Sequence, residues 1–428
     1  MRKQKRLHTP AVLEKPVIGI HEAIDTVLAA VRPLSGQEVD LLDALGRAAA
    51  EDVVSPENVP SFDNSAMDGY AVRGAELEEG RREFRVVVDV PAGHWADDLL
   101  GPGEAAKIMT GAPLPPGVDT VVQVEHTEQD GELLVVRDAP RTGANVRRAA
   151  EDIAQGDVVI PRGARLGPAE IGVLASIGMR RVSVASRPRV AVLATGSELV
   201  APGKPLGPSQ IRNSNSFSAG SQVLMAGGDP ILLGIARDDL DETRRLIGAA
   251  LQNDVVITSG GVSVGEYDFV KQVQEELGVE RRFWGVATKP GKPLAFGVRG
   301  DTLVFGVPGN PVAAMVSFEM YIRPALLAMQ GRRDLFRPYV FAAAEEPVAG
   351  TRARTEARRC RLVHRGRGWG FSTTGPQGSA ILRSMALADS LAFVPPAFPG
   401  AEAGEEFLVM MLDGTSEERP PFPGAEPV

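Results

Sequence analysis

The segment at residues 254–268, DVVITSGGVSVGEYD, constrains the fold of this chain more than any other stretch. Residues 255–257 form a short β-branched run, which is typical of a strand buried on both faces of a parallel sheet. Gly260 and Gly261 follow closely, and glycine allows the positive φ that lets backbone N–H groups converge on an anion. Because a helical pattern starts at Phe269, the segment predicts a strand, a glycine turn and a helix N-terminus.

Two acidic residues, Glu266 and Asp268, stand between the glycines and the expected helix. A helix N-terminus binds phosphate, and carboxylate oxygens are the ligands that Mg²⁺ prefers, so the segment predicts a site for a phosphorylated ligand with a divalent cation. The alternative is an ordinary strand–helix turn that uses glycine only for its geometry.

The same alternation of strands and helices runs from about residue 189 to residue 331. Strands are expected at 190–194, 231–235, 255–258 and 303–307, with helices at 217–225, 242–251 and 312–329. This βαβ pattern predicts a doubly wound parallel sheet with helices on both faces. Ligands bind at the carboxyl ends of the strands in such sheets, and Glu198 and Asp238 would meet the glycine turn there.

The rest of the chain divides into smaller units, so we expect a multidomain protein with a central α/β domain, an inserted β-rich module and a C-terminal β domain. The expected units are a flexible arm at 1–17, a discontinuous linking domain of helices and strands at 18–55 and 153–187, the inserted module at 56–152, the α/β domain at 188–333, the C-terminal β domain at 334–415 and a disordered Pro-rich tail at 416–428.

The composition excludes several classes of protein. The formal net charge of −9 argues against a dedicated nucleic-acid binder. The single cysteine, Cys360, allows no internal disulfide and no thiolate metal cluster, and the five scattered histidines do not predict a zinc site. No run reaches ~18 apolar residues, so no membrane span is expected. The sequence therefore predicts a cytoplasmic protein with no nucleic-acid or membrane partner.

Two further turns lie near the expected sheet edge. Residues 288–293, TKPGKP, carry Lys289 and Lys292, which would be useful counter-charges for phosphate or another oxyanion. Residues 307–311, VPGNP, place Asn310 between a strand and a helix, where it could cap the helix or bind a ligand. Either turn could instead be an ordinary surface connection.

Two motifs suggest other chemistries. Residues 261–265 match G-x-S-x-G, the nucleophile elbow of the α/β-hydrolases, in a strand–turn–helix context. A triad would need a later acid and then a histidine, and only His364 follows, so a serine hydrolase is kept as an alternative. Residues 285–292 resemble a Walker A loop, but five residues separate the glycines and Pro293 stands where Mg²⁺ needs Ser or Thr, which excludes a P-loop NTPase.

Seven segments in a fixed order carry a family resemblance. They are SFDNSAMDGYAVR at 61–73, KIMTGAPLPPG at 107–117, GANVRRAAEDI at 143–153, LATGSEL at 193–199, SGGVSVGEYDF at 259–269, KPGKP at 289–293 and VPGNP at 307–311. Together they closely resemble the molybdopterin molybdenumtransferase (MoeA) family, to which the E domain of gephyrin also belongs. The resemblance runs from about residue 18 to residue 412.

The resemblance implies an enzyme of molybdenum cofactor biosynthesis that inserts molybdate into adenylylated molybdopterin, in a Mg²⁺-assisted step that releases AMP. It also implies an elongated homodimer, with a cleft between the α/β domain of one subunit and the inserted module of the other. A molybdopterin adenylyltransferase is a candidate partner. A non-catalytic scaffold of the gephyrin type is the second alternative, because a partner-binding surface leaves no motif.

The residue patterns and the resemblance together give the candidate site. The candidate catalytic residues are Asp68, Glu198, Asp238 and Asp268, of which the last three are also the expected Mg²⁺ ligands. The candidate substrate-binding residues are Thr110, Arg147, Asp152, Ser259, Gly260, Gly261, Lys289, Lys292, Pro308, Asn310, Pro311, Arg365 and Ser379. Among them, the lysines and arginines would hold phosphate or molybdate.

One position departs from the family pattern. A lysine often stands four residues before the one matched by Lys289, and this chain has Gly285 there. One basic contact is therefore missing or is supplied from elsewhere. A lysine introduced at this position is expected to improve oxyanion binding, unless the backbone requires glycine there.

Overall fold

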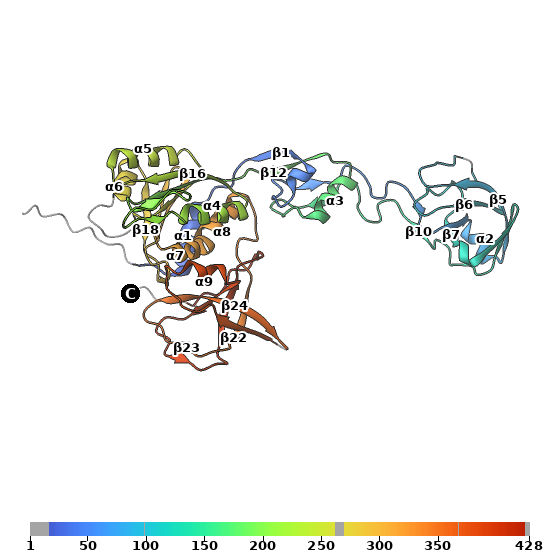
Figure 1. Cartoon of the computed structure of the whole chain (residues 1–428). Helices are drawn as coiled ribbons and strands as arrows, with labels where there is room; N and C mark the ends of the chain where they lie inside the picture. Colours follow the sequence, from blue (N-terminus) through green and yellow to red (C-terminus); the bar gives the residue numbers. More distant parts are fainter. Residues whose placement is uncertain (1–16, 98, 262–268, 367, 424–428) are drawn as a thin grey trace, which may run out of the picture.

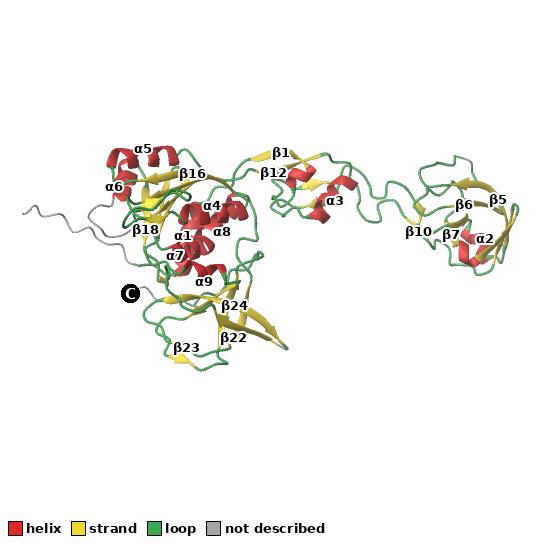
Figure 2. Cartoon of the chain, in the orientation of Figure 1, coloured by secondary structure: helices red, strands yellow, loops and turns green. Residues whose placement is uncertain are grey.

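The computed structural model describes residues 17–97, 99–261, 269–366 and 368–423. The chain is elongated (Figure 1): the α/β domain and the C-terminal domain lie together at one end, the linking domain lies in the middle and the inserted module lies at the other end. Helices gather in the α/β domain, whereas the inserted module and the C-terminal domain consist mainly of strands and loops (Figure 2).

The α/β domain is built on a six-stranded sheet with the order β16-β13-β17-β21-β20-β18. Four strands are parallel: β13 (Arg189–Thr195), β16 (Asp229–Ala236), β17 (Val255–Ser259) and β21 (Thr302–Val307). The other two, β18 (Glu280–Trp284) and β20 (Ala295–Arg299), are antiparallel to their neighbours. All five residues of β17 are buried, which confirms the strand predicted from the β-branched run.

Helices cover both faces of this sheet, which confirms the doubly wound architecture. One apolar cluster joins the sheet to α5 (Leu240–Ala250) and α6 (Phe269–Glu276). A larger cluster on the other face includes α4 (Asn215–Met225), α7 (Pro311–Ser317) and α8 (Arg323–Met329). Among the described residues, the helical stretch Pro311–Met329 is long and apolar enough to span a membrane, but 89 % of its apolar 18-residue window is buried, as expected of a core helix.

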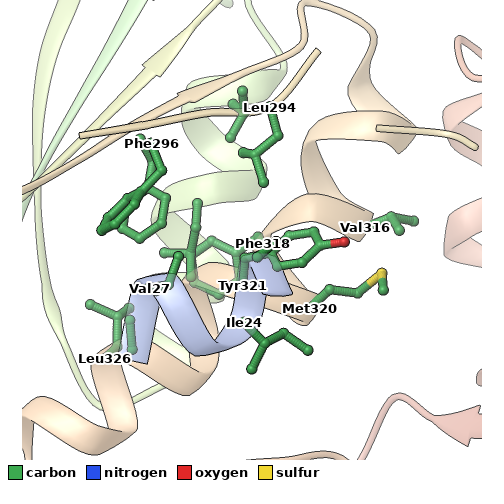
Figure 3. Close-up of a cluster of buried hydrophobic side chains, with 14 of the residues drawn as sticks. Ile24, Val27, Leu294, Phe296, Val316, Phe318, Met320, Tyr321 and Leu326 are labelled. Carbon is green, nitrogen blue, oxygen red and sulfur yellow. The ribbon is translucent and has the colours of Figure 1, made fainter. Parts of the chain in front are cut away.

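Helix α1 (Ile20–Ala30) belongs to the core of the α/β domain. The expected division assigned this part of the chain to the linking domain, and the structure corrects that assignment. The buried side chains of Ile20, Ile24 and Val27 recur at helical spacing and form one apolar stripe. In Figure 3, Ile24 and Val27 lie among side chains of the α7–α8 region such as Tyr321. The sequence pattern shows the stripe, but it cannot show which domain covers it.

The linking domain joins two distant parts of the chain. Strand β1 (Gly36–Asp40) pairs with β12 (Arg181–Ala185), and β2 (Val53–Val54) pairs with β11 (Val158–Ile160). Helix α3 (Pro168–Ser176) packs over them around a small apolar core.

The inserted module contains a six-stranded sheet with the order β7-β4-β6-β5-β9-β8. Its elements are β4 (Gly69–Val72), α2 (Gly74–Glu78), β5 (Glu83–Val90), β6 (Glu104–Ile108), β7 (Thr120–Gln123), β8 (Thr127–Asp130) and β9 (Leu133–Val136). A small ribbon of β3 (Asn64–Ser65) and β10 (Val146–Arg147) lies where the module meets the linking domain.

The C-terminal domain is a closed ring of strands, because β24 pairs with both β25 and β26. Its main strands are β22 (Tyr339–Ala344), β24 (Thr355–Arg365), β25 (Gly368–Thr373), β26 (Ser390–Val394) and β28 (Glu406–Met411). The short strand β19 (Thr288–Lys289) leaves the α/β domain and pairs in parallel with the start of β24. This pairing ties the two domains together at the turn that carries the predicted lysines.

The end of the chain is another correction, because part of the tail that was expected to be disordered is packed. Phe422 is 5 % exposed, and its ring lies 4.9 Å from that of Phe393. The Thr355 hydroxyl donates a hydrogen bond of 2.8 Å to the carbonyl of Pro423. Arg419 forms an ion pair of 2.7 Å with Asp25 on α1. The Pro-rich composition suggested disorder, but one buried aromatic ring anchors the segment.

Candidate functional site

The turns at the carboxyl edge of the sheet bring several predicted residues to one place. Because β13, β16, β17 and β21 are parallel, the segments that follow them meet at this edge. Glu198 follows β13, Asp238 follows β16 and Pro308 follows β21. Asp268, together with Glu266, lies outside the described residues. The turns that carry Glu198, Asp238 and Pro308 therefore lie at one edge of the sheet.

The glycine turn after β17 requires both of its glycines. Gly260 has φ of +90° and Gly261 has φ of +64°, in the left-handed region that side chains disfavour. A Cβ atom on Gly260 would lie 2.7 Å from the carbonyl oxygen of Thr195, and one on Gly261 would lie 2.7 Å from the side chain of Val270. The turn is thus held tightly between β13 and α6, with little room for any side chain.

A buried amide, Asn215, joins this turn to its neighbour. Its Nδ2 atom donates to Ser259 Oγ over 2.7 Å and to the carbonyl of Gly309 over 2.8 Å. One side chain at the start of α4 therefore connects the end of β17 to the turn after β21. Sequence reasoning missed Asn215, because a run of Asn and Ser before a helix is typical of an ordinary helix cap. The buried contact that distinguishes it exists only in the folded chain.

The expected Mg²⁺ ligands are carboxylates at the same edge, and carboxylate oxygens fit a magnesium ion. The Glu198 carboxylate folds back over Gly196, where an added Cβ would lie 2.3 Å from Oε2. The backbone N–H of Asp238 donates to Ser197 Oγ over 3.2 Å, which places the two acidic turns side by side. Within the described ranges, no group of three His, Cys, Asp or Glu side chains is gathered closely enough to hold a metal. Asp268, the third expected ligand, lies outside the described residues.

A pocket of about 580 Å³ lies between the α/β domain and the C-terminal domain. It gathers five of the predicted residues: Lys289, Lys292, Pro308, Asn310 and Ser379. Asn310 Nδ2 donates to Ser379 Oγ over 3.0 Å, so the turn after β21 contacts the C-terminal domain directly. Pro311 begins α7 at the rim of this turn. Cationic, amide and hydroxyl groups thus surround one cavity.

The pocket also contains arginines that sequence reasoning missed, namely Arg354, just before β24, and Arg358 and Arg359 within it. Arg359 is 1 % exposed and donates to Ser384 Oγ and to the carbonyl of Gly378, each over 3.0 Å. Burial lowers the pKa of its guanidinium. The available signal was the run RARTEARRCR, because its arginines flank the start of a strand and then occupy both faces of it.

Arg365 was the predicted arginine of this domain, and it lies elsewhere. It ends β24, seven residues beyond Arg358, which corresponds to about 24 Å along a strand. Its Nε atom donates to Glu345 Oε1 over 2.8 Å on an exposed face. Arg365 therefore does not line the pocket, and the other arginines of β24 supply the charge.

A second cavity, of about 760 Å³, opens beside the acidic turns at the sheet edge. Its lining combines apolar side chains such as Leu199 and Ile235 with the polar groups of Ser197, Gln210 and Arg237. The carboxyl edge thus carries one strongly cationic cavity and one cavity of mixed character.

The remaining predicted residues lie in or beside the inserted module. Asp68 Oδ1 accepts hydrogen bonds from the backbone N–H of Thr110 over 2.7 Å and from its hydroxyl over 2.8 Å. These bonds hold the pKa of Asp68 below its ordinary value, and the backbone bond has the larger effect. Arg147 lies on β10, and the backbone N–H of Asp152 donates to the carbonyl of Val59. Within one chain, this group is far from the sheet edge (Figure 1).

Gly285, the departure from the family pattern, does not line the pocket. Its φ is +89°, and an added Cβ would lie 3.3 Å from the side chain of Val17. Its N–H donates to the carbonyl of Leu294, and its carbonyl accepts from the N–H of Ile18. The backbone therefore favours glycine here, which supports the structural alternative over a missing anion contact.

The hydrolase interpretation finds no support among the described residues. The elbow serine, Ser263, lies outside them. His364 lies on β24 in the C-terminal domain, where its ring packs edge-on against Trp369 at 5.1 Å.

Comparison with known proteins covers nearly the whole chain. Residues 18–178 match the MoeA N-terminal region (domain I and II), residues 191–328 match the probable molybdopterin binding domain and residues 342–412 match the MoeA C-terminal region (domain IV).

Relatives and solved structures agree with these matches. Molybdopterin molybdenumtransferase 2 of Mycobacterium tuberculosis is 38 % identical over 398 residues, which cover 90 % of this chain and 96 % of the relative. Molybdopterin molybdenumtransferase of Haemophilus influenzae is 41 % identical over 314 residues, or 73 % and 77 % of the two chains. The crystal structure of the molybdopterin biosynthesis MoeA protein from Pyrococcus horikosii superimposes with a TM-score of 0.81 at 32 % identity, covering 93 % of this chain and all of that one. The chain therefore belongs to the molybdopterin molybdenumtransferase (MoeA) family.

Proposed function

We propose that this protein inserts molybdate into adenylylated molybdopterin and releases AMP, as a step of molybdenum cofactor biosynthesis. The observation that carries the proposal is the cavity of about 580 Å³ in which Lys289, Lys292 and Arg358 lie with the neutral donors Asn310 and Ser379. Ammonium and guanidinium groups form strong charge-assisted hydrogen bonds to anionic oxygens, and the neutral groups add direction. Such a set suits a small tetrahedral oxyanion.

The neighbouring sheet edge would hold the organic substrate. Gly260 and Gly261 form a tight turn at a parallel strand end, which is where phosphorylated ligands bind in open α/β sheets. Glu198 and Asp238 would hold Mg²⁺ together with Asp268. The ion would supply neutralisation of the charge that develops on the phosphoanhydride when AMP leaves. The two lysines and Arg358 would keep the oxyanion beside this edge while the phosphoanhydride is cleaved.

The acting species in this proposal is a homodimer. Asp68 and Thr110 lie in a module at the opposite end of the molecule from the α/β edge, so one chain alone does not bring all candidate residues together. A second copy can supply its module to the edge. Helix α4 also carries Phe217, Leu224 and Met225, which are 50 %, 59 % and 76 % exposed, and such apolar surface suits a protein contact.

A cytoplasmic location and a molybdopterin adenylyltransferase partner belong to the same proposal. The substrate carries an adenylyl group, and an adenylyl transfer must precede the step proposed here.

The decisive experiment incubates the protein with adenylylated molybdopterin, Mg²⁺ and molybdate, and follows AMP. We expect AMP release to require both the metal ion and molybdate. Arg358→Ala should reduce the rate strongly, whereas Arg365→Ala, on the same strand but outside the pocket, should retain it. Equal AMP release in excess EDTA would overturn the metal-assisted step, and equal loss in the two variants would overturn the role given to the pocket.

A further inference from the structure

One carboxylate, that of Glu356, lies inside the cationic pocket. The charged side chains that line the pocket are five cations and this single acid. Glu356 Oε1 accepts from Lys289 Nζ over 2.7 Å, and its Oε2 accepts from Arg358 Nη2 over 3.2 Å. The acid thus occupies hydrogen-bond donors of two of the cations that an incoming oxyanion would need.

The position of this acid is fixed by the backbone. The parallel pairing of β19 with β24 sets Thr288 opposite Thr355 and Lys289 opposite Glu356. Glu356 and Arg358 are two residues apart on one strand, so they share a face. Thr355, on the opposite face, is fully buried and bonded to the end of the chain. The backbone therefore keeps Glu356 at the pocket, and its carboxylate can move away only by rotation of the side chain.

The two contacts of Glu356 differ in how far they are exposed to solvent. The side chains of Glu356 and Arg358 are 14 % and 11 % exposed, whereas that of Lys289 is 55 % exposed. Arg358 has a second acceptor in the carbonyl of Ala349, at 2.6 Å. The contact between Lys289 and Glu356 faces solvent, where an ion pair contributes little stability. Of the two cations that contact Glu356, Lys289 is therefore the one that an anion in solution can recruit more readily.

We propose that Glu356 is a resident counter-anion of the pocket, which the incoming oxyanion must displace from Lys289. It keeps Lys289 and Arg358 positioned in the free protein and lowers the affinity of the pocket for small inorganic anions in general. Glu356 touches the cations and not the reacting atoms, so it is a positioning residue. The inference rests on the proposed function only in naming the pocket as the oxyanion site.

The test measures binding of inorganic molybdate and, separately, of inorganic sulfate to the full-length chain by calorimetry. Glu356→Gln keeps the shape of the side chain and removes its charge. We expect both dissociation constants to fall by roughly three- to tenfold, because one negative charge is removed beside a bound dianion. Glu345→Gln is the matched control, since it removes the acid from another Glu–Arg pair that includes a β24 residue outside the pocket; it should leave both constants unchanged.

A second pair of variants tests whether the effect of Glu356→Gln depends on its contact with Lys289. In Lys289→Met, the contact that the anion must break is already absent, so adding Glu356→Gln should change the dissociation constant less than it does in the wild type. Unchanged or weaker binding in Glu356→Gln, with an unchanged melting curve, would overturn the role of Glu356 while the wild-type affinity still supports the pocket. A wild-type protein that binds neither anion would overturn both the pocket and this inference.

Discussion

Arg358 and Arg359 are adjacent in the sequence and have different surroundings. Successive residues of a strand face opposite sides, so Arg358 reaches Glu356 in the pocket, whereas Arg359 is committed to Ser384 and the carbonyl of Gly378. A positive charge near a cavity therefore does not by itself identify an anion ligand. The acceptors that each guanidinium already has decide how readily it can bind one.

The hydrogen bonds between Asp68 and Thr110 predict how the stability of the fold depends on pH. The pKa of Asp68 is held below its ordinary value by hydrogen bonds to the ionised form, the backbone bond first. The folded state therefore binds this proton more weakly than the unfolded chain does. The stabilising effect is complete above the unfolded pKa, ~3.9, and is lost as the pH falls through the lower folded value.

Melting temperatures measured from pH 7 to pH 2 check this. Asp68→Asn should melt below the wild type at neutral pH, and the gap should narrow as the pH falls. Asp130→Asn, which changes an exposed acid of the same module, should show no such convergence. A gap that stays constant down to pH 2 would mean that the ionised form of Asp68 does not stabilise the fold.

Gly285→Lys should destabilise the protein without improving molybdate use. Its φ of +89° and the contact with Val17 both oppose a side chain, at a cost of about 1–3 kcal/mol. Gly278→Lys is the matched control, since Gly278 has a similar φ of +80° with no atom within 4 Å of an added Cβ. Melting curves should show the larger loss for position 285. A lower molybdate concentration for half-maximal rate in Gly285→Lys would contradict the structural reason for this glycine.

At the scale of elements, the sequence predicted the long regular segments well. The β-branched residues of β17 and the glycines after it specify a buried strand and a tight turn through local chemistry alone. The pairing of β19 with β24 could not be predicted, because a two-residue strand carries no periodicity and its partner lies 67 residues away. That pairing brings the start of β24 to the pocket. The turn that carries Lys289 was therefore predicted, whereas the contributions of Glu356 and Arg358 were not.

The packed end of the chain gives a prediction at the same scale. Phe422→Ala should destabilise the fold by about 3 kcal/mol, because it removes a buried ring that contacts Phe393 and His21. Phe341→Ala, which changes a ring that is 56 % exposed on β22, should cost much less. Chemical denaturation of both variants compares the two costs. Equal costs would show that the tail contributes no more than surface packing does.

At the scale of the whole molecule, candidate residues are divided between two ends of an elongated chain (Figure 1). The α/β edge carries Glu198 and Asp238, and the inserted module carries Asp68 and Thr110. Sequence motifs gave both groups but carried no information about their separation in space. In the proposed dimer, the module of one copy lies at the sheet edge of the other, so each cleft needs residues from both copies.

Complementation between variants tests this sharing. Asp68→Ala and Asp238→Ala should each be nearly inactive as homodimers. After subunit exchange, a mixture should recover about a quarter of wild-type activity, because half of the dimers are mixed and each mixed dimer has one intact cleft. A recovery of zero, with exchange confirmed by mass spectrometry, would show that each cleft is built within one chain.

The two chain segments that connect the linking domain to the inserted module lie side by side, which allows the module to be removed. Val59 and Ile153 are antiparallel partners there, so the chain enters and leaves the module at adjacent points. Paired residues of this kind lie about 5 Å apart, a gap that a two-residue hairpin turn closes. A shortened gene in which Asn-Gly replaces residues 60–152 should therefore yield a soluble, folded protein that binds molybdate but releases no AMP. The module would then be a detachable part, which could be returned to the reaction as a separate polypeptide.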